Sequence, residues 1–208
     1  ASFFGGTKER NPDCCIWVCR KPKGAREWTS PQLAADGVFS IKDAQATLAG
    51  IDSTCTPVTN ARGKLIARRK ACWNPVLFQI PGGDLILFYK IGLNVGDWTG
   101  WLVRSKDGGK TWGKREVLPE GFLGPIKNKP EYINGRIICP SSREGKGGWR
   151  IHFEYSDDKG KTWKTTESVP AELSVPTQNR KKGGINVDDQ EAGEAIQGEG
   201  AQPILAIQ

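Results

Sequence analysis

Charged side chains gather in a short segment near the start of the sequence, between two apolar stretches. Residues 7 to 13 contain Lys8, Glu9, Arg10 and Asp13. Carboxylates can exchange protons with a bound molecule, and basic groups beside them can hold an anion. This segment is therefore the first candidate site. The alternative interpretation is that Asp13, which follows Pro12, only ends a loop.

The residue types that form metal or nucleophile sites are sparse. Six cysteines occupy positions 14, 15, 19, 55, 72 and 139, and no two of them form a C-x-x-C pair. Cys14 and Cys15 are adjacent and alternate across a strand, so we expect reduced thiols rather than a disulfide framework. The single histidine, His152, lies in a predicted strand and is expected to be structural. The sequence predicts no metal and no cofactor.

The elements that position these residues are revealed by a repeated motif. Both Ser105–Trp112 and Ser156–Trp163 read S-x-D-x-G-x-T-W, and their tryptophans lie 51 residues apart. Asp and Gly close a tight turn, Ser and Thr bind its polar ends, and Trp fills the gap between neighbouring sheets. A turn of this kind joins two antiparallel strands, so each copy predicts a hairpin, and the fixed interval predicts a repeat fold.

A second, fainter repeat consists of a polar residue, then Pro, then an apolar run. It occurs at residues 74–78, 129–133 and 202–205. Pro suits the first residue of a strand, where no ladder donor is lost. The first two copies are each followed by a Gly turn and a second strand, at 85–89 and 137–139. A polar loop then leads to a third strand, at 100–104 and 149–155, which ends in the S-x-D-x-G-x-T-W turn. This order predicts a four-stranded meander twice over. Residues 149–155 alternate, with Trp149, Ile151, Phe153 and Tyr155 on one side and Arg150, His152 and Glu154 on the other.

The S-x-D-x-G-x-T-W motif is the Asp box, and the chain resembles the sialidase superfamily of β-propellers. Phe4–Glu9, Trp73–Phe78 and Gly124–Pro130 are also similar to segments of the BNR-type, sialidase-like proteins of plants and bacteria. The resemblance covers residues 1–36, 72–165 and 199–208. It implies an all-β, six-bladed propeller of which about half of the ring, roughly three blades, is present.

The blades can be placed along the chain from this resemblance. Residues 1–36 are expected to form an incomplete first blade, 73–118 the second, 127–169 the third and 199–208 the first strand of a fourth, with 170–198 as a flexible connection. Trp28 and Trp112 lie 84 residues apart, whereas the next interval, from Trp112 to Trp163, is 51 residues. The extra residues fall within residues 38–71. We expect that surplus to be an inserted surface loop with a short helix near 42–48; a gene-model artefact is the competing explanation. The absence of Met suggests a fragment.

The resemblance also implies roles for particular residues. In such blades the second-to-third-strand loops and the starts of the first strands share the face opposite the Asp boxes. In sialidases an aspartate of the first such loop is a general acid/base, and Asp13 is at the corresponding place; burial would have to raise its pKa. Lys127 and Asn128 would bind sugar hydroxyls or a carboxylate at the rim of the axis, or be solvated. The weaker candidates are Lys8, Glu9, Arg10, Asp97, Trp98, Arg143 and Glu144, and Glu199 as the glutamate that assists the tyrosine nucleophile.

These features together define the expected function. The parent protein is expected to be an exo-glycosidase that acts on a terminal, possibly anionic sugar of a glycan or glycoconjugate. Two of the three carboxylate-binding arginines and the tyrosine of sialidases belong to later blades, so this chain should be inactive alone. A non-catalytic carbohydrate-binding or interaction propeller is the alternative, and a truncated product without function is a third possibility.

Composition excludes other classes of partner. The net charge is +7, but no nucleic-acid recognition motif accompanies it, so the basic cluster at residues 64–70 is expected to be a solvated face. No apolar stretch approaches the eighteen residues of a membrane span. Neither nucleic acid nor a membrane is therefore expected as a partner, and compartment and oligomeric state are not predicted.

Overall fold

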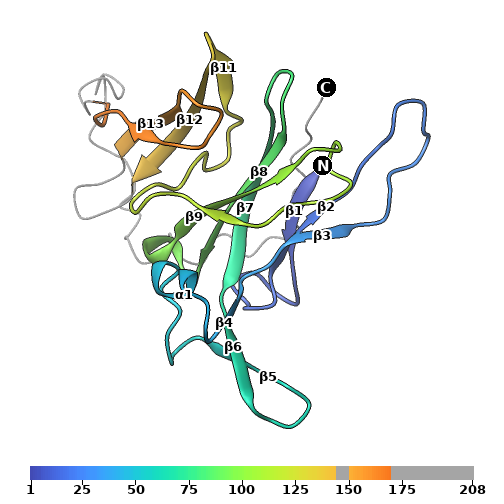
Figure 1. The fold of residues 1–208 in the computed structure, drawn as a ribbon, viewed down its shortest axis with the longest axis vertical. Coiled ribbons are helices and arrows are strands. Elements are labelled where there is room, and N and C mark those ends of the chain that lie inside the picture. Colours follow the sequence, from blue (N-terminus) through green and yellow to red (C-terminus); the bar gives the residue numbers. More distant parts are fainter. Residues whose placement is uncertain (144–149, 170–208) are drawn as a thin grey trace, which may run out of the picture.

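The computed structural model describes residues 1–143 and 150–169, and nearly all of its regular elements are strands (Figure 1). The first sheet contains β1 (Ser2–Gly5), β2 (Cys15–Val18) and β3 (Gln32–Ala35). The central sheet contains β7 (Ala71–Gln79), β8 (Leu85–Gly92), β9 (Thr99–Ser105) and β10 (Glu116–Val117). The last sheet contains β11 (Glu131–Ile133), β12 (Arg136–Arg143), β13 (Arg150–Ser156) and β14 (Lys164–Thr165).

In each of these three sheets, consecutive strands pair antiparallel with their neighbours in the sequence. This meander is the arrangement of a propeller blade. The all-β prediction is confirmed, and the described residues form a partial β-propeller with no closed ring. No helix among the described residues is long and apolar enough to cross a membrane.

The central sheet is apolar on both faces, and this is why it lies in the middle. In β8 every residue from Ile86 to Gly92 is buried. Leu87 and Tyr89 face a cluster shared with Ile16 of the first sheet, whereas Phe88 faces a cluster shared with Ile137 of the last sheet. A strand buried on both faces is a continuous apolar run rather than an alternating one, and its two faces attach the outer sheets.

The two S-x-D-x-G-x-T-W segments, here called the repeat turns, have the same geometry. The Asp107 carboxylate accepts hydrogen bonds from the Thr111 amide at 2.9 Å and the Thr111 hydroxyl at 2.6 Å. Asp158 accepts the same pair from Thr162 at 2.8 and 2.6 Å. Each turn also uses glycine in the left-handed region, as a tight turn requires.

The repeat turns connect neighbouring sheets, as the motif predicted. The Trp163 ring packs edge-on against Phe88 of the central sheet, with centroids 5.7 Å apart. The Arg104 guanidinium of β9 donates to the carbonyls of Lys159 and Gly160 in the second turn at 3.0 and 2.9 Å. The turns therefore stabilise the contact between sheets as well as the hairpins.

The prediction of a surface loop at residues 38–71 was wrong, because these residues form a sheet of their own. It contains β4 (Val38–Ser40), β5 (Thr56–Thr59) and β6 (Leu65–Arg69), ordered β4-β6-β5, with helix α1 (Gln45–Leu48) between β4 and β5. The short helix was correctly predicted. The strands were missed because they are short and bury few residues, mainly Phe39 and Ala67. We call this segment the inserted sheet.

One arginine attaches the inserted sheet to the central one. Arg115, next to β10, donates to the Asp43 carboxylate and the Val38 carbonyl, each at 2.9 Å. Its guanidinium lies 3.8 Å from the centroid of the Phe39 ring, and Phe39 packs edge-on against Trp101 of β9. The ion pair with Asp43 and the cation–π contact with Phe39 are both partly buried. Together they attach the inserted sheet to the central sheet.

The alternation predicted for residues 149–155 is present in β13, but its polar side faces inward. His152 and Glu154 are buried, whereas Ile151 is 57% and Phe153 38% exposed. The physical reason is that Glu154 receives the amides of Leu123 at 3.1 Å and Gly124 at 2.6 Å, which satisfies a buried carboxylate. Trp149 lies outside the described residues.

We predict that the repeat turns make the fold acid-sensitive. Hydrogen bonds from the Thr hydroxyls and amides lower the pKa of Asp107 and Asp158 below the ordinary value. A lowered pKa in the folded state gives stability that is present above about pH 4 and is lost as the pH falls further. A D107N/D158N variant should therefore melt several degrees lower at pH 7 and show a flatter dependence of Tm on pH between pH 5 and 2.

Thermal unfolding followed by circular dichroism at several pH values measures this effect. E120Q, which removes one exposed carboxylate outside the turns, is the control and should behave like the wild type. An unchanged Tm and slope in the double variant would show that the turn carboxylates do not contribute.

Candidate functional site

The loops that the sequence analysis selected lie at the ends of the strands away from the repeat turns. In a meander the β8–β9 loop and the β9–β10 turn are at opposite ends of the sheet. We call the first end the loop face; it consists of residues 6–13, 93–98, 121–128 and 142–143. The Cys72 amide of β7 donates to the Cys14 carbonyl at 3.0 Å, and the ring of Trp73 in β7 packs at a tilt against that of Trp98, with centroids 5.5 Å apart, so β7 contacts the chain beside the first loop and the end of the second.

Asp13 is held within its own loop. Its carboxylate accepts the Thr7 amide at 2.8 Å and a short hydrogen bond from the Thr7 hydroxyl, while the Oδ1 atom is shielded from water without a partner. The Thr7 hydroxyl and amide lower the pKa of Asp13. The raised pKa that a general acid requires is therefore not present in this geometry, and Asp13 is a carboxylate at neutral pH.

The three charged neighbours of Asp13 are exposed. No side-chain hydrogen bond forms within the described residues for Lys8, Glu9 or Arg10. Arg10 adopts a φ of 71°, a left-handed conformation that is uncommon outside glycine, so the backbone turns sharply here. The structure brings these side chains to the loop face but not into contact with Asp13.

The expectation of a solvated basic face at residues 64–70 was wrong for three of its four side chains. Lys70 is only 4% exposed and pairs with Asp97 at 2.7 Å. Arg69 donates to the Asp13 carbonyl at 3.1 Å and the Cys15 thiol at 2.9 Å, and Arg68 donates to two carbonyls. Neighbouring acceptors, invisible in the sequence, draw these cations inward, and only Lys64 is fully exposed.

The Lys70–Asp97 pair orders the β8–β9 loop. Asp97 also accepts the amides of Leu93 at 3.0 Å and Asn94 at 2.7 Å and belongs to a short 3-10 turn, η1 (Val95–Asp97). Burial alone would raise the pKa of Asp97, but the hydrogen bonds from Lys70 and these amides lower it overall. The inserted sheet, which ends at Lys70, thereby fixes a loop of the candidate site.

A cavity of about 450 Å³ opens between this loop and the last sheet. Most of its wall is apolar, with Arg143 as its cation; it includes Val95, Trp98, Leu123, Ile126, Ser142 and Arg143. The indole nitrogen of Trp98 is buried without a partner. An apolar cleft with one cation and a few polar groups suits a small ligand that is partly apolar and partly anionic or hydroxylated. Among the predicted residues, the structure brings Trp98 and Arg143 together here.

Two other groups of predicted residues have different outcomes. Lys127 and Asn128 follow Ile126 in an exposed bend at the edge of the cavity wall. Glu144 and Glu199 lie outside the described residues. In the described parts of the chain, no three His, Cys, Asp or Glu side chains gather in a way that could hold a metal ion, and the six cysteines form no disulfide.

Sequence reasoning missed a buried cation behind the cavity. Lys90 of β8 is fully buried and donates to the carbonyls of Pro125 and Asn74. Asn74 lies at a register shift in β7 and has a φ of 40°. Lys90 binds the Pro125 carbonyl, and Glu154 binds the amides of Leu123 and Gly124. The two buried side chains therefore fix the backbone of residues 123–125, and Leu123 forms part of the cavity wall. In the sequence, Lys90 merely interrupts an apolar run.

Burial lowers the pKa of Lys90 to about 7, despite the opposing effect of the nearby Glu154 carboxylate. The ordinary value in an unfolded chain is about 10.4. Between about pH 7 and 10 the unfolded state therefore binds more protons at this site than the folded state, and the free energy of unfolding should rise with pH. Its slope should reach up to about 1.4 kcal/mol per pH unit.

We predict that K90M removes this pH dependence. Urea unfolding at pH 6.5, 7.5 and 8.5 measures it, with K64M, which alters an exposed lysine, as the control. As the pH rises, the free energy of unfolding of the wild type should increase relative to that of K90M. An equal slope in both proteins would mean that Lys90 titrates normally.

Comparison with known proteins identifies a family. Residues 1–183 match the model of a family described as BNR repeat-like domain. Two solved structures of Trypanosoma rangeli sialidase are similar, with a TM-score of 0.48 each: one is a covalent intermediate with 2,3-difluorosialic acid at 18% identity, the other a complex with sialic acid at 17%. The match covers 76% of this chain and 26% of theirs, so the chain spans about a quarter of their length. No curated protein matches the sequence.

Proposed function

Because the chain belongs to the BNR repeat-like domain family, we propose that it functions as a carbohydrate-active β-propeller of the sialidase type, with the loop face as its glycan site. The observation that carries the proposal is the cavity of about 450 Å³ beside Trp98 and Arg143. Its size is in the range of small-molecule sites. It opens on the same face as Asp13, where the motif analysis expects function to collect.

The lining of the cavity suits a terminal sugar with an anionic group. Apolar walls from Val95, Leu123 and Ile126 can pack against the C–H faces of a pyranose. The Arg143 guanidinium can form a paired hydrogen bond with a carboxylate, and the unpartnered Trp98 N–H offers a donor to a hydroxyl. Lys127 and Asn128 extend the same rim. The proposed ligand is therefore a terminal, anionic sugar of a glycan or glycoconjugate.

Hydrolysis of that sugar is the finer part of the proposal. An acid/base role for Asp13 requires a proton on its carboxyl group near neutral pH, and Thr7 opposes this. A bound sugar would have to displace the Thr7 hydroxyl and exclude water before Asp13 could donate a proton to the glycosidic oxygen. Glu199, as the glutamate that assists a tyrosine nucleophile, and Glu144, as a substrate-binding residue, stay proposals, and we expect no turnover by this chain in isolation.

The alternative is a carbohydrate-binding propeller without catalysis. The Asp13–Thr7 contact favours it, because a carboxylate with a lowered pKa accepts hydrogen bonds from sugar hydroxyls and does not donate a proton. In that case Asp13 contributes affinity only. The two functions differ in what happens when the Thr7 hydroxyl is removed.

Binding and turnover with one sugar test the proposal. Sialic acid should bind the 208-residue chain and change its tryptophan fluorescence, and R143Q should weaken binding about 10-fold through loss of the paired hydrogen bond. R62Q, an exposed arginine on the hairpin of the inserted sheet, is the matched control and should bind normally. Absence of saturable binding, or equal weakening by R62Q, would contradict the glycan site.

A fluorogenic sialoside separates catalysis from binding. The chain alone should release no fluorophore; robust hydrolysis would overturn the expected inactivity. If hydrolysis occurs, D13N should reduce it at least about 100-fold while sialic acid still binds, as for a general acid. T7V should shift the alkaline limb of the rate profile to higher pH, because it removes one hydrogen bond that lowers the pKa of Asp13.

A further inference from the structure

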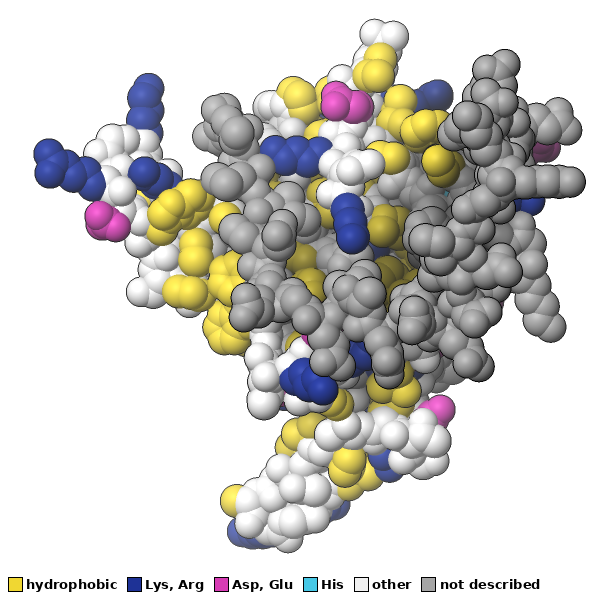
Figure 2. Space-filling view, turned by 180° about the vertical axis from the view of Figure 1, so that it is seen from behind, with side chains coloured by type: hydrophobic (Ala, Val, Ile, Leu, Met, Phe, Trp, Pro, Cys, Tyr) yellow, Lys and Arg dark blue, Asp and Glu magenta, His cyan; other side chains and the backbone are white. Residues whose placement is uncertain are grey.

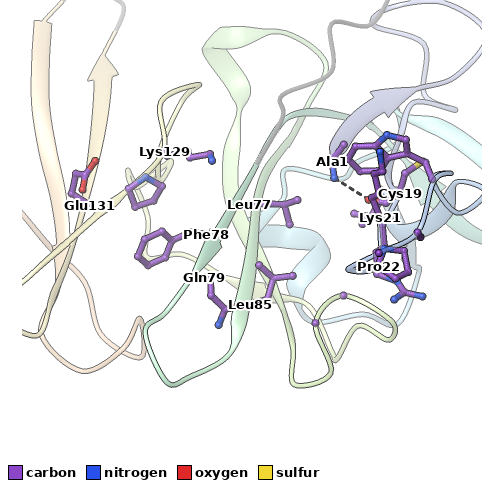
Figure 3. A pocket seen from close by; sticks show the side chains of 18 residues that line it. Ala1, Cys19, Lys21, Pro22, Leu77, Phe78, Gln79, Leu85, Lys129 and Glu131 are labelled. Carbon is purple, nitrogen blue, oxygen red and sulfur yellow. Dashed lines mark hydrogen bonds between the residues drawn. The ribbon is translucent and has the colours of Figure 1, made fainter. Parts of the chain in front are cut away.

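A second cavity lies on the opposite side of the molecule from the loop face. Its volume is about 660 Å³, and it extends from the first sheet across the end of β7 to the start of β11. Gly108 and Gly109 of the first repeat turn line it, so we call it the turn-face cavity. Figure 3 shows Leu77 and Phe78 of β7 between Cys19 and Lys21 on one side and Lys129 and Glu131 on the other. The function proposed above makes no use of this space.

Unpaired positive charge surrounds the turn-face cavity. Arg20, Lys21 and Lys129 line it, and Glu131 is its one carboxylate. Within residues 1–143 and 150–169, none of these three cations forms a side-chain ion pair or hydrogen bond. The Ala1 ammonium also lines the cavity, but it donates to the Cys19 carbonyl at 2.9 Å. The local charge therefore favours an anion.

One of these cations is partly buried and has an unsatisfied donor. Arg20 is half-buried, and its Nε atom is shielded from water without an acceptor. A buried donor without a partner costs free energy, and such groups in a folded protein call for an explanation. The terminal nitrogens of the Arg20 guanidinium are not shielded in this way and have no partner among the described residues, so they can donate two parallel hydrogen bonds to a bound carboxylate or sulfate.

The other walls suit the body of a sugar. Trp28 lines the cavity and is 43% exposed, and Phe78 and Leu77 add apolar surface. A flat, accessible indole can pack against the C–H face of a pyranose ring. The Gln79 amide nitrogen already donates to the carbonyls of Ile80 and Gly83, which leaves its oxygen free to accept. The Glu131 carboxylate can also accept hydrogen bonds, for example from sugar hydroxyls.

From this combination we propose that the turn-face cavity binds an acidic saccharide. Its carboxylate or sulfate pairs with Arg20 and Lys129, its ring packs on Trp28, and its hydroxyls donate to Glu131 and Gln79. An anion without hydroxyl donors, such as inorganic sulfate, would leave Glu131 unpaired beside a like charge and should bind more weakly. The site goes beyond the proposed function: it lies on another face and does not depend on catalysis at the loop face.

Calorimetric titration of the full chain with digalacturonate, a sulfated disaccharide and neutral maltose tests the proposal and distinguishes a carboxylate from a sulfate ligand. One of the two acidic disaccharides should bind saturably, and at least 10-fold more tightly than maltose or inorganic sulfate. K129Q and R20Q should each weaken it about 10-fold, and W28A should weaken it without changing its salt dependence. K129Q alters an exposed side chain, so its result does not depend on whether R20Q folds.

Two controls keep the result specific. K64Q removes the same charge from the hairpin of the inserted sheet and should bind like the wild type; equal weakening by K64Q would reduce the effect to the net charge of +7 and overturn the site. Equal affinity for maltose, or no saturable binding of either acidic disaccharide, would also overturn it. R143Q should leave acidic disaccharide binding unchanged and K129Q should leave sialic acid binding unchanged, so failure of one site is distinguishable from failure of the other.

Discussion

The structure depends on burying both faces of the central sheet. A sheet that is apolar on one face needs one neighbour, whereas β7–β10 needs two, because Leu87 and Phe88 point to opposite sides into separate clusters. The first sheet and the inserted sheet cover one side, and the last sheet covers the other (Figure 1). Removing a large side chain from such a core typically costs about 2–5 kcal/mol. The same need explains why a repeat fold of this kind is stable only as an array.

The packing of the sheets places the loops, and polar contacts then fix them. Lys70 of the inserted sheet holds Asp97, Arg69 holds the Asp13 backbone, and Lys90 with Glu154 holds residues 123–125. The loop face is thus tied to buried groups of several sheets. Figure 2, the view from behind Figure 1, shows apolar side chains with a few separate Lys and Arg side chains among them.

The sequence was sufficient where local chemistry decides the structure. Turn residues in S-x-D-x-G-x-T-W predicted the meanders of β7–β10 and β11–β14 in the correct order. Pro130 directly precedes β11 as expected, whereas β7 begins at Ala71 and contains Pro75 at its register shift, so Pro75 does not start the strand. It was insufficient where distant partners decide. The amides of Leu123 and Gly124 turn Glu154 inward, and Asp97 draws Lys70 out of what looked like a solvated cluster. The strands of the inserted sheet are too short for alternation to be visible. Asp13 lies in the loop between β1 and β2, but its pKa depends on Thr7, whose contact with it no pattern predicts.

The central claim is that the loop face binds a terminal anionic sugar. Hydrogen exchange measured by mass spectrometry, with and without saturating sialic acid, tests it most directly, because protection maps the contact without assuming catalysis. The account predicts slower exchange at residues 93–98 and 121–128. Protection confined to the repeat turns, or no change anywhere at saturation, would contradict it.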